Sequence, residues 1–263
     1  MATDLFDQKL RAMRRDRAFR SGTELFLLER AFGDVLDRLA LVNRSFGAAL
    51  LIGCPDPGWS DRLLQLAGTV DVMDPGALFA AAARGEQCLE DRLEVEPGAY
   101  DLAIAVGTLD SVNDISRALL TIRLALREDS LLLGAVAGGQ SLPRLRAAMR
   151  AADEQAGVAT PHVHPRIEPA ALTTLLSSAG FTMPVVDVDR VQVSYQTLWD
   201  LVRDLRAMGA TNVLHARSRR PLTRSQAAAA AAQFASAAES GRVIERFELL
   251  HFAAWTPAAP ANV

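Results

Sequence analysis

The sequence contains few cysteines, little net charge and no long apolar run. Its two cysteines, Cys54 and Cys88, give neither a disulfide framework nor a metal-ligand set, and they fit a reducing compartment. The formal net charge of −3 argues against a general nucleic-acid binder, whose domain would be strongly basic. No apolar run is long enough to cross a bilayer, and the first residues lack the pattern of a secretion signal. We therefore expect a cytoplasmic protein with no transmembrane segment and no nucleic-acid partner.

Basic residues are concentrated near the start of the chain. They are Arg11, Arg14, Arg15, Arg17 and Arg20. A transit peptide or a contact with an anionic surface would carry such a pattern, but Asp4, Asp7 and Asp16 weaken both interpretations. The interpretation that we favour is the solvated face of a helix.

Short apolar runs alternate with helical patterns through the first half of the chain. At 263 residues, half of them hydrophobic, the chain is long enough for one large α/β domain. Helical spacing at 24–42 precedes strand patterns at 48–52, 70–73, 88–93, 100–106 and 130–136. Because these strands are apolar throughout, we expect helices on both of their faces, and hence a doubly wound, mostly parallel sheet.

The second half of the chain completes this sheet. Helical patterns occur at 142–154, 169–179, 197–208 and 225–239, and strand patterns occur at 185–193 and 244–255. We predict one domain over 1–257 with a seven-strand, Rossmann-like sheet and an antiparallel last strand near 243–255. Its expected parts are N-terminal helices at 1–44, a nucleotide-binding core at 45–140, a substrate or lid region at 141–220, and a last helix and strand at 221–257.

The turn after the first predicted strand is the expected cofactor loop. Ligands of doubly wound sheets bind outside the carboxyl ends of the strands, where glycines let the backbone approach closely. Here the loop runs from Gly53 through Cys54 and Asp56 to Gly58. Two prolines, at positions 55 and 57, each remove an amide donor. The loop therefore looks damaged.

Carboxylates follow the next two strands. Asp74 stands where a carboxylate commonly accepts hydrogen bonds from a ribose. Glu90 and Asp91 suit an adenine amino group, and Val106 and Gly107 end the fourth strand on the same edge. Taken singly, each acid suits a solvated loop, whereas their common register with the loop favours a cofactor site.

Other catalytic schemes have little support in the sequence. His162 and His164 are neighbours in a loop, but no cysteine or acid lies near them at metal-ligand spacing, so we predict no metal site. A surface or lid position suits this pair better. The chain contains no Gly-x-Ser-x-Gly elbow and no phosphate-binding Gly-Lys-Ser/Thr loop. Arg217, Arg219 and Arg220 form a basic cluster that would either grip an acidic partner or lie solvated in a loop.

The element order, Asp74 and a closing strand that ends in Trp255 resemble class I methyltransferases that depend on S-adenosylmethionine (SAM). More narrowly, the chain resembles the branch of the biotin-pathway carrier-protein methyltransferase and the mitochondrial complex I assembly factor, which hydroxylates an arginine of a complex I core subunit. The matching segments are Phe6-Asp7 with the arginine-rich helix, Tyr100-Asp101-Leu102, Val112-Asn113-Asp114, Gly138-Gly139, Ser141-Leu142, Leu145-Arg146 and His162 to Pro165. The most specific match, Tyr195 to Asn212 and on to Arg217, looks like the assembly-factor group.

The chain also departs from this family. Intact members carry Gly-x-Gly-x-Gly in the first loop and an aspartate at the end of the first strand, where this chain has Leu51-Ile52. A Leu-His-Trp pattern after the fourth strand is replaced by Leu109-Asp110-Ser111. These changes put the methionine end of a SAM pocket in doubt and leave the ribose and adenine end through Asp74, Glu90 and Asp91.

The resemblance implies SAM as cofactor and leaves three functions open. They are a methyltransferase for a small molecule or carrier protein, an enzyme that modifies an arginine of a complex I subunit, and a non-catalytic assembly chaperone. We favour an enzyme and assign no catalytic residue. The expected substrate or partner contacts are Asn113, His162, His164, Tyr195, Arg206, Asn212 and Arg217. A guanidinium substrate needs a carboxylate, for which Asp110, Asp114 and Asp204 are the candidates; alternatively, the segment at 197–208 is a helix with a core face and solvated charges.

Overall fold

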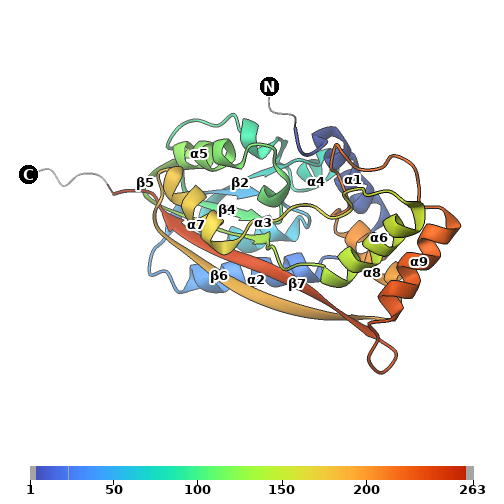
Figure 1. The fold of residues 1–263 in the computed structure, drawn as a ribbon. Helices are drawn as coiled ribbons and strands as arrows, with labels where there is room; N and C mark the ends of the chain where they lie inside the picture. The colour runs from blue at the N-terminus through green and yellow to red at the C-terminus, as the bar shows by residue number, and fades with distance from the viewer. Residues whose placement is uncertain (1–3, 23, 259–263) are drawn as a thin grey trace, which may run out of the picture.

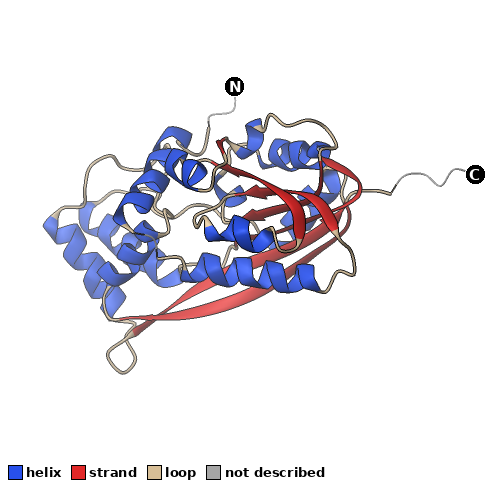
Figure 2. Cartoon of the chain, turned by 180° about the vertical axis from the view of Figure 1, so that it is seen from behind, coloured by secondary structure: helices blue, strands red, loops and turns tan. Residues whose placement is uncertain are grey.

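The computed structural model describes residues 4–22 and 24–258, which form a seven-strand sheet with helices on both sides (Figures 1 and 2). The strands are β1 (Phe46–Ile52), β2 (Ala67–Asp74), β3 (Glu86–Gln87), β4 (Tyr100–Val106), β5 (Leu126–Ala137), β6 (Thr182–Tyr195) and β7 (Val243–Trp255). Their order across the sheet is β3-β2-β1-β4-β5-β7-β6, and β7 runs antiparallel to both β5 and β6. The predicted fold class is confirmed.

The helices include those that the sequence predicts, although several of the predicted ends differ by a few residues and α4 was not predicted. They are α1 (Gln8–Ser21), α2 (Phe26–Ala40), α3 (Gly58–Leu63), α4 (Ala77–Ala82), α5 (Ile115–Ala125), α6 (Pro143–Ala156), α7 (Pro169–Ser178), α8 (Leu198–Ala207) and α9 (Arg224–Ala235). Two short 3-10 helices, η1 (Glu90–Arg92) and η2 (Leu109–Ser111), follow β3 and β4. No described helix is long and apolar enough to cross a membrane.

Alternate residues of the central strands pack into two separate cores. Leu50 and Ile52 of β1 join the core beneath α5 and α7, while Ala49 and Leu51 join the core beneath α2 and α3. This alternation follows from the two-residue period of a strand. All four side chains are buried, which is why the strand reads as a continuous apolar run.

The third strand and the last pair of strands differ from the prediction. The third strand is β3, which lies before the predicted 88–93, and part of that range forms η1 instead. Strand β6 extends to Tyr195, opposite Val243 of β7. The ends of this long pair pack with α6, α8 and α9 in a further apolar cluster, at the end of the molecule away from the C-terminus (Figure 1). The extra length of β6 and β7 therefore positions a layer of helices, α6, α8 and α9, beside the carboxyl edge of the sheet.

Candidate functional site

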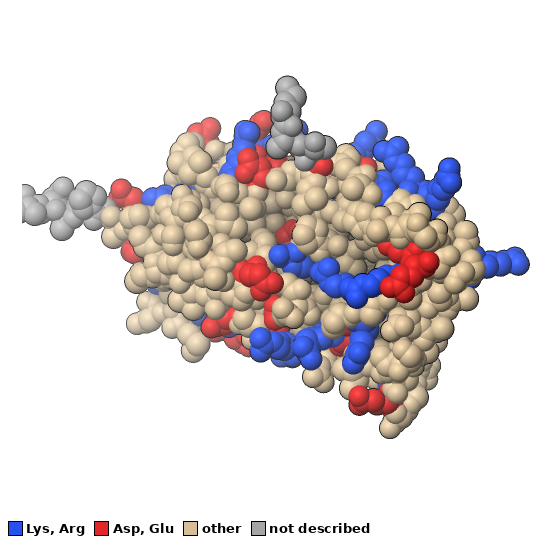
Figure 3. Space-filling model, viewed as in Figure 1, with Lys and Arg blue, Asp and Glu red and all other residues tan. Residues whose placement is uncertain are grey.

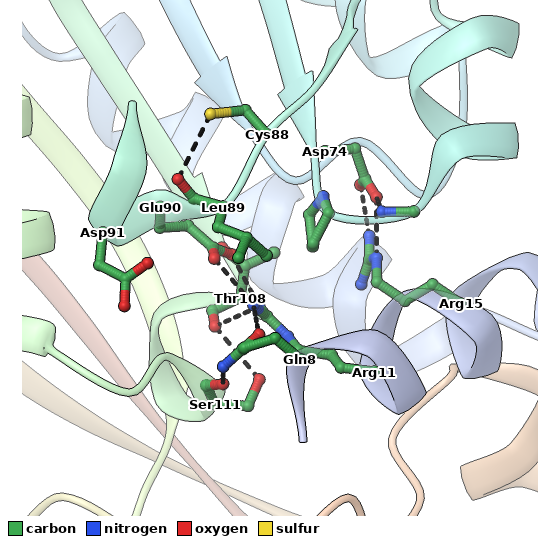
Figure 4. A network of polar contacts seen from close by, with 12 residues as sticks. Gln8, Arg11, Arg15, Asp74, Cys88, Leu89, Glu90, Asp91, Thr108 and Ser111 are labelled. Carbon is green, nitrogen blue, oxygen red and sulfur yellow. Dashed lines mark hydrogen bonds and ion pairs between the residues drawn. The ribbon is translucent and has the colours of Figure 1, made fainter. Parts of the chain in front are cut away.

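Helix α1 lies beside the carboxyl ends of β2 and β4, where the fold places a ligand (Figure 4). The Asp7 side chain caps the helix by accepting a hydrogen bond from the Leu10 amide at 2.9 Å. Phe6, the residue before this cap, is held by two hydrogen bonds to the Asn113 side chain. Asn113 accepts from the Phe6 amide at 2.8 Å and donates to the Phe6 carbonyl at 2.9 Å. Positions four apart share one face of a helix, so Arg11 and Arg15 point together toward the sheet.

Arg11 pairs with Glu90 at the adenine end of the expected cofactor site. Its two terminal nitrogens donate to the two carboxylate oxygens of Glu90 at 2.8 and 2.7 Å, and one of them also donates to the Thr108 carbonyl at 2.7 Å. Burial lowers the pKa of Arg11, but the adjacent Glu90 carboxylate outweighs this effect and the net pKa is raised. The pair is almost fully buried, with exposed fractions of only 4% for Arg11 and 1% for Glu90.

Arg15 pairs with Asp74 at the ribose end of the site. The Arg15 Nε donates to Asp74 Oδ1 at 2.8 Å, and its terminal nitrogen donates to Oδ2. The amides of Gly76 and Cys54 donate to the same two oxygens, at 2.7 and 2.9 Å. Four donors thus satisfy a carboxylate that is 0% exposed. A ribose can reach Asp74 only after Arg15 has left.

These two pairs correct two expectations from the sequence. The face of α1 that carries Arg11 and Arg15 is buried, so the prediction of a solvated face is wrong for these two residues. Asp74, Glu90 and Asp91 are buried as well, so they are not solvated loop charges. The physical reason is that both arginines lie on the face of α1 that packs against the sheet edge, where each meets a buried carboxylate. The signal in the sequence was the pair of arginines four residues apart.

The loop from Gly53 to Gly58 uses its amides within the protein. Gly53 has φ +83°, and a Cβ there would meet the Thr108 methyl at 2.4 Å, so glycine is required. The amide of Gly53 donates to the Met73 carbonyl at 2.7 Å, and that of Gly58 donates to Asp56 Oδ1 at 2.9 Å. Burial, together with nearby Asp74, raises the pKa of Cys54 to about 12. The Cys54 thiol is therefore protonated and is not a nucleophile.

A small cavity of about 110 Å³ adjoins the two ion pairs. Its apolar wall comes from the ends of β4 and β5, from α2, and from the side chains of Leu205 and Met208. Its charged lining is Arg11, Arg15, Asp110, Arg166 and Glu248. Asp110 forms an ion pair with Arg166, so a carboxylate that the sequence offered to a guanidinium substrate already holds the chain's own guanidinium. No pattern in the sequence pointed to Arg166 or Glu248 as residues of this cavity.

His164 is buried beside this cavity and is neutral. Its Nε2 accepts a hydrogen bond from the Val213 amide at 2.9 Å, which requires an unprotonated nitrogen. Burial and the nearby Arg166 guanidinium lower the pKa of His164 to about 4. His162 lies apart from it and pairs with Asp153 at 2.8 Å. The described residues hold no cluster of three or more groups suited to a metal ion.

The residues expected to contact a substrate or partner divide into two sets: Asn113 and Tyr195 lie elsewhere, whereas one hollow is lined by His162, His164, Arg206, Asn212 and Arg217. Tyr195 is 4% exposed and packs with α8 and α9, so it offers a partner no surface. Asn212 and Arg217 support their own loop, since Asn212 donates to the Pro161 carbonyl and Arg217 donates to the Leu214 carbonyl, both at 2.8 Å. Arg206 is exposed. The core face of α8 is formed by Leu198, Leu201 and Leu205, as the alternative interpretation expected.

The expected cofactor residues cluster more closely. Cys54, Asp74 and Glu90 meet α1 directly or through one hydrogen bond, and Val106 and Gly107 line the small cavity. Asp91 lies on the outer side, where its Oδ2 accepts from the Asp114 amide at 3.3 Å and its Oδ1 has no partner among the described residues. Asp56 and Gly58 are occupied with each other. Of the acids predicted to bind a cofactor, Asp74 and Glu90 are therefore occupied by arginines of α1.

Comparisons with known proteins agree with this architecture. The sheet order and the flanking helices are those of class I SAM-dependent methyltransferases. A solved structure of phosphoethanolamine N-methyltransferase 2 from Haemonchus contortus, in complex with S-adenosylhomocysteine, matches 86% of this chain and 52% of its own with a TM-score of 0.52 and 13% identity. At that identity the match shows the fold alone. No family model matches the sequence.

Two relatives narrow the assignment. The arginine-hydroxylase NDUFAF5, mitochondrial, of Danio rerio is 30% identical over 97% of this chain and 83% of its own length. A malonyl-[acyl-carrier protein] O-methyltransferase of Laribacter hongkongensis is 28% identical over 94% of this chain and 84% of its own length. The chain belongs to the NDUFAF5 arginine-hydroxylase family of methyltransferase-fold proteins, as the resemblance predicted.

Proposed function

We propose that this protein is a complex I assembly factor that modifies a partner protein and uses SAM, and that helix α1 closes its cofactor site in the free chain. The observation that carries this proposal is the pairing of Arg11 with Glu90 and of Arg15 with Asp74. The NDUFAF5 relatives support the link to complex I and to an arginine substrate. Cofactor binding then requires α1 to withdraw both arginines.

The presence of both buried acids, Asp74 and Glu90, supports a role in binding the cofactor. A buried ion pair adds little net stability, because desolvation offsets its attraction, and apolar residues of similar volume are often as stable. Two such pairs side by side are therefore not needed to hold the fold. Once the arginines leave, Asp74 would hold the ribose and Glu90 the adenine. SAM supplies the reactive group when it is bound, and the residues of this chain form its binding site.

If α1 closes the cofactor site, the affinity of the protein for SAM should depend on how easily α1 moves away. A ligand that binds only the open state has an apparent affinity reduced by the fraction of molecules that are open. Alanine at Arg11 and Arg15 removes the closing contacts, so the double variant should bind SAM and S-adenosylhomocysteine about tenfold or more tightly than the native protein. The matched control is Arg17→Ala with Arg20→Ala, because both side chains lie on the same helix and are exposed. Isothermal calorimetry measures all three proteins.

The double variant leaves two buried carboxylates without partners, which costs about 3–5 kcal/mol for each broken pair. A milder change guards against loss of folding. Asp7→Ala removes the helix cap and the ion pair of Asp7 with Arg217 but keeps both acids and both arginines. It should cost about 1 kcal/mol and raise the affinity in the same direction. If no folded variant binds either ligand at millimolar concentration, the closed-site proposal is wrong.

A second candidate function is a non-catalytic assembly protein. The observation that favours it is the first loop, in which Pro55 and Pro57 have no amide donor and the Cys54 amide is taken by Asp74. Complementation of a strain that lacks the family's homologue separates the two candidates. Rescue by a folded Asp74→Asn protein that binds no SAM would support the non-catalytic role. Loss of rescue by that protein would support the enzyme.

The cellular location remains our proposal. The sequence predicts the cytoplasm, whereas the zebrafish and mouse relatives are named mitochondrial. Fractionation of the native cells decides between a cytoplasmic compartment and another one. A general nucleic-acid partner is not part of the proposal, since the net charge is −3.

A further inference from the structure

A second hollow, which adjoins the small cavity and shares His164 and Arg166 with its lining, lies between α6, α8 and the loop that leads to α9. We call it the arginine groove, and its volume is about 540 Å³. Its polar lining comprises Arg14, His162, His164, Arg166, Arg206, Thr211, Asn212, Arg217, Ser218, Arg219 and Arg220. These residues come from α1, from α8 and from the loops at 157–168 and 208–223. The basic cluster noted in the sequence is therefore one wall of a larger site.

The charge of the groove is of one sign. Six arginines line it, and none of the described residues that line it is Asp or Glu. Arg217 pairs with Asp7 and Arg166 with Asp110, outside the groove. For Arg14, Arg206, Arg219 and Arg220, the part of the chain that the structure describes provides no ion pair. Figure 3 shows that Lys and Arg side chains gather at this end of the molecule, away from the C-terminus.

The arginines repel one another because this groove brings together side chains of like charge, although the whole chain carries a net charge of −3. Burial, together with the positive charges of Arg17, Arg206 and Arg217, lowers the pKa of Arg14. The Nε of Arg14 is also buried without a hydrogen-bond partner. A buried donor without a partner costs free energy, and so does the repulsion between like charges. A bound carboxylate would accept a hydrogen bond from this donor and would also balance the positive charge.

The floor of the groove is apolar. Half-buried Met149, Val163, Val202 and Leu222 line it, with Leu145 and Leu205 beneath. A small inorganic anion would use only the arginines, whereas a peptide that carries both carboxylates and apolar side chains would use the arginines and the floor together. Arginine beside apolar surface is also the composition typical of residues that dominate the binding energy of protein interfaces.

We propose that the arginine groove binds an acidic segment of a partner protein, in which Asp and Glu alternate with Leu or other apolar residues. The inference rests on the proposed function only in assigning chemistry to a protein partner, and the groove includes neither of the two ion pairs that close the cofactor site. Arginine forks pair bidentately with carboxylates, so the four unpaired arginines supply orientation as well as charge. The apolar floor supplies the buried contact area.

The probe for this proposal is a fluorescein-labelled peptide of alternating Glu and Leu, measured by fluorescence anisotropy with the full chain and no SAM. The test variant is Arg206→Gln with Arg219→Gln and Arg220→Gln, and the matched control is Arg84→Gln with Arg92→Gln and Arg117→Gln. All six arginines are exposed, so both variants should fold, and they lose the same charge. We expect the test variant to bind about tenfold or more weakly, and the control to bind like the native protein.

Three results would overturn the proposal. One is equal weakening in the test variant and the control, which would indicate attraction by overall charge. Another is unchanged binding of a peptide with Gln in place of Glu, which would leave the arginines without a role. The last is displacement of the peptide by tripolyphosphate together with equal binding of a peptide that lacks Leu, which would indicate a phosphate site. Since no outcome involves SAM, failure here leaves the closed cofactor site untouched.

Discussion

At the scale of single residues, the site is governed by charges that are buried and paired. Arg11 and Arg15 are satisfied by Glu90 and Asp74, whereas His164 is buried without a charged partner of its own. The two arginines are paired with carboxylates, and the histidine is neutral. The buried neutral histidine makes the stability of the protein depend on pH.

His164 should make the protein less stable in mild acid. Its pKa is about 4 in the folded chain, against 6.5 for the unperturbed group, so the unfolded state binds the proton first. Stability should therefore fall as the pH decreases from 6.5 toward 4, by on the order of 3 kcal/mol from this group. Urea unfolding as a function of pH should show a shallower fall for His164→Gln. Exposed His215→Gln is the control and should keep the native slope.

At the scale of elements, α8 and α9 each begin at a side-chain cap. The Thr197 hydroxyl accepts from the Asp200 amide at 3.2 Å, and the Asp200 carboxylate accepts from the Thr197 amide at 3.0 Å. The same reciprocal arrangement starts α9 at Thr223 and Gln226. Each cap satisfies amides that have no partner inside the helix. The caps fix where α8 and α9 begin.

Removal of the cap on α8 should weaken the protein modestly. Thr197→Ala leaves the first amides of the helix exposed and should lower the free energy of unfolding by about 1 kcal/mol. Thr197→Ser keeps a hydroxyl and should lose only a few tenths of that amount. Both values come from urea denaturation. Equal losses in the two variants would mean that the methyl group and its packing matter more than the cap.

At the scale of the whole molecule, the long strands β6 and β7 join two apolar clusters. Their carboxyl-edge ends pack with α6, α8 and α9, while Phe252 and Ala254 of β7 lie in the core under α5 and α7. We propose that residues 1–257 form one domain, of which 1–3 and 23 lie outside the described residues. A continuous strand pair that enters both clusters should couple their unfolding.

This proposal predicts one cooperative transition. In a Trp199→Phe protein, the remaining tryptophans, Trp59 and Trp255, report on the sheet, while far-ultraviolet ellipticity includes the helices of the α6–α9 layer. The two signals should give the same denaturation midpoint. A lower midpoint for ellipticity would indicate that the helical layer unfolds first, and the proposed domain would then be two units. The exposed position of Trp199, at 48%, makes this substitution mild.

The sequence by itself determined the order of strands and helices, the antiparallel last strand and the position of Asp74 at the end of β2. These features follow from the periodicity of apolar residues and from the positions at which each strand pattern ends. Both signals are local, because each depends on a few neighbouring residues. Only the tertiary structure decided that Arg15 meets Asp74 across 59 positions and that Arg11 meets Glu90 across 79. It also decided that arginines from separate segments share one groove. Such pairings depend on how helices pack against the sheet, and packing leaves no periodic signal in the chain.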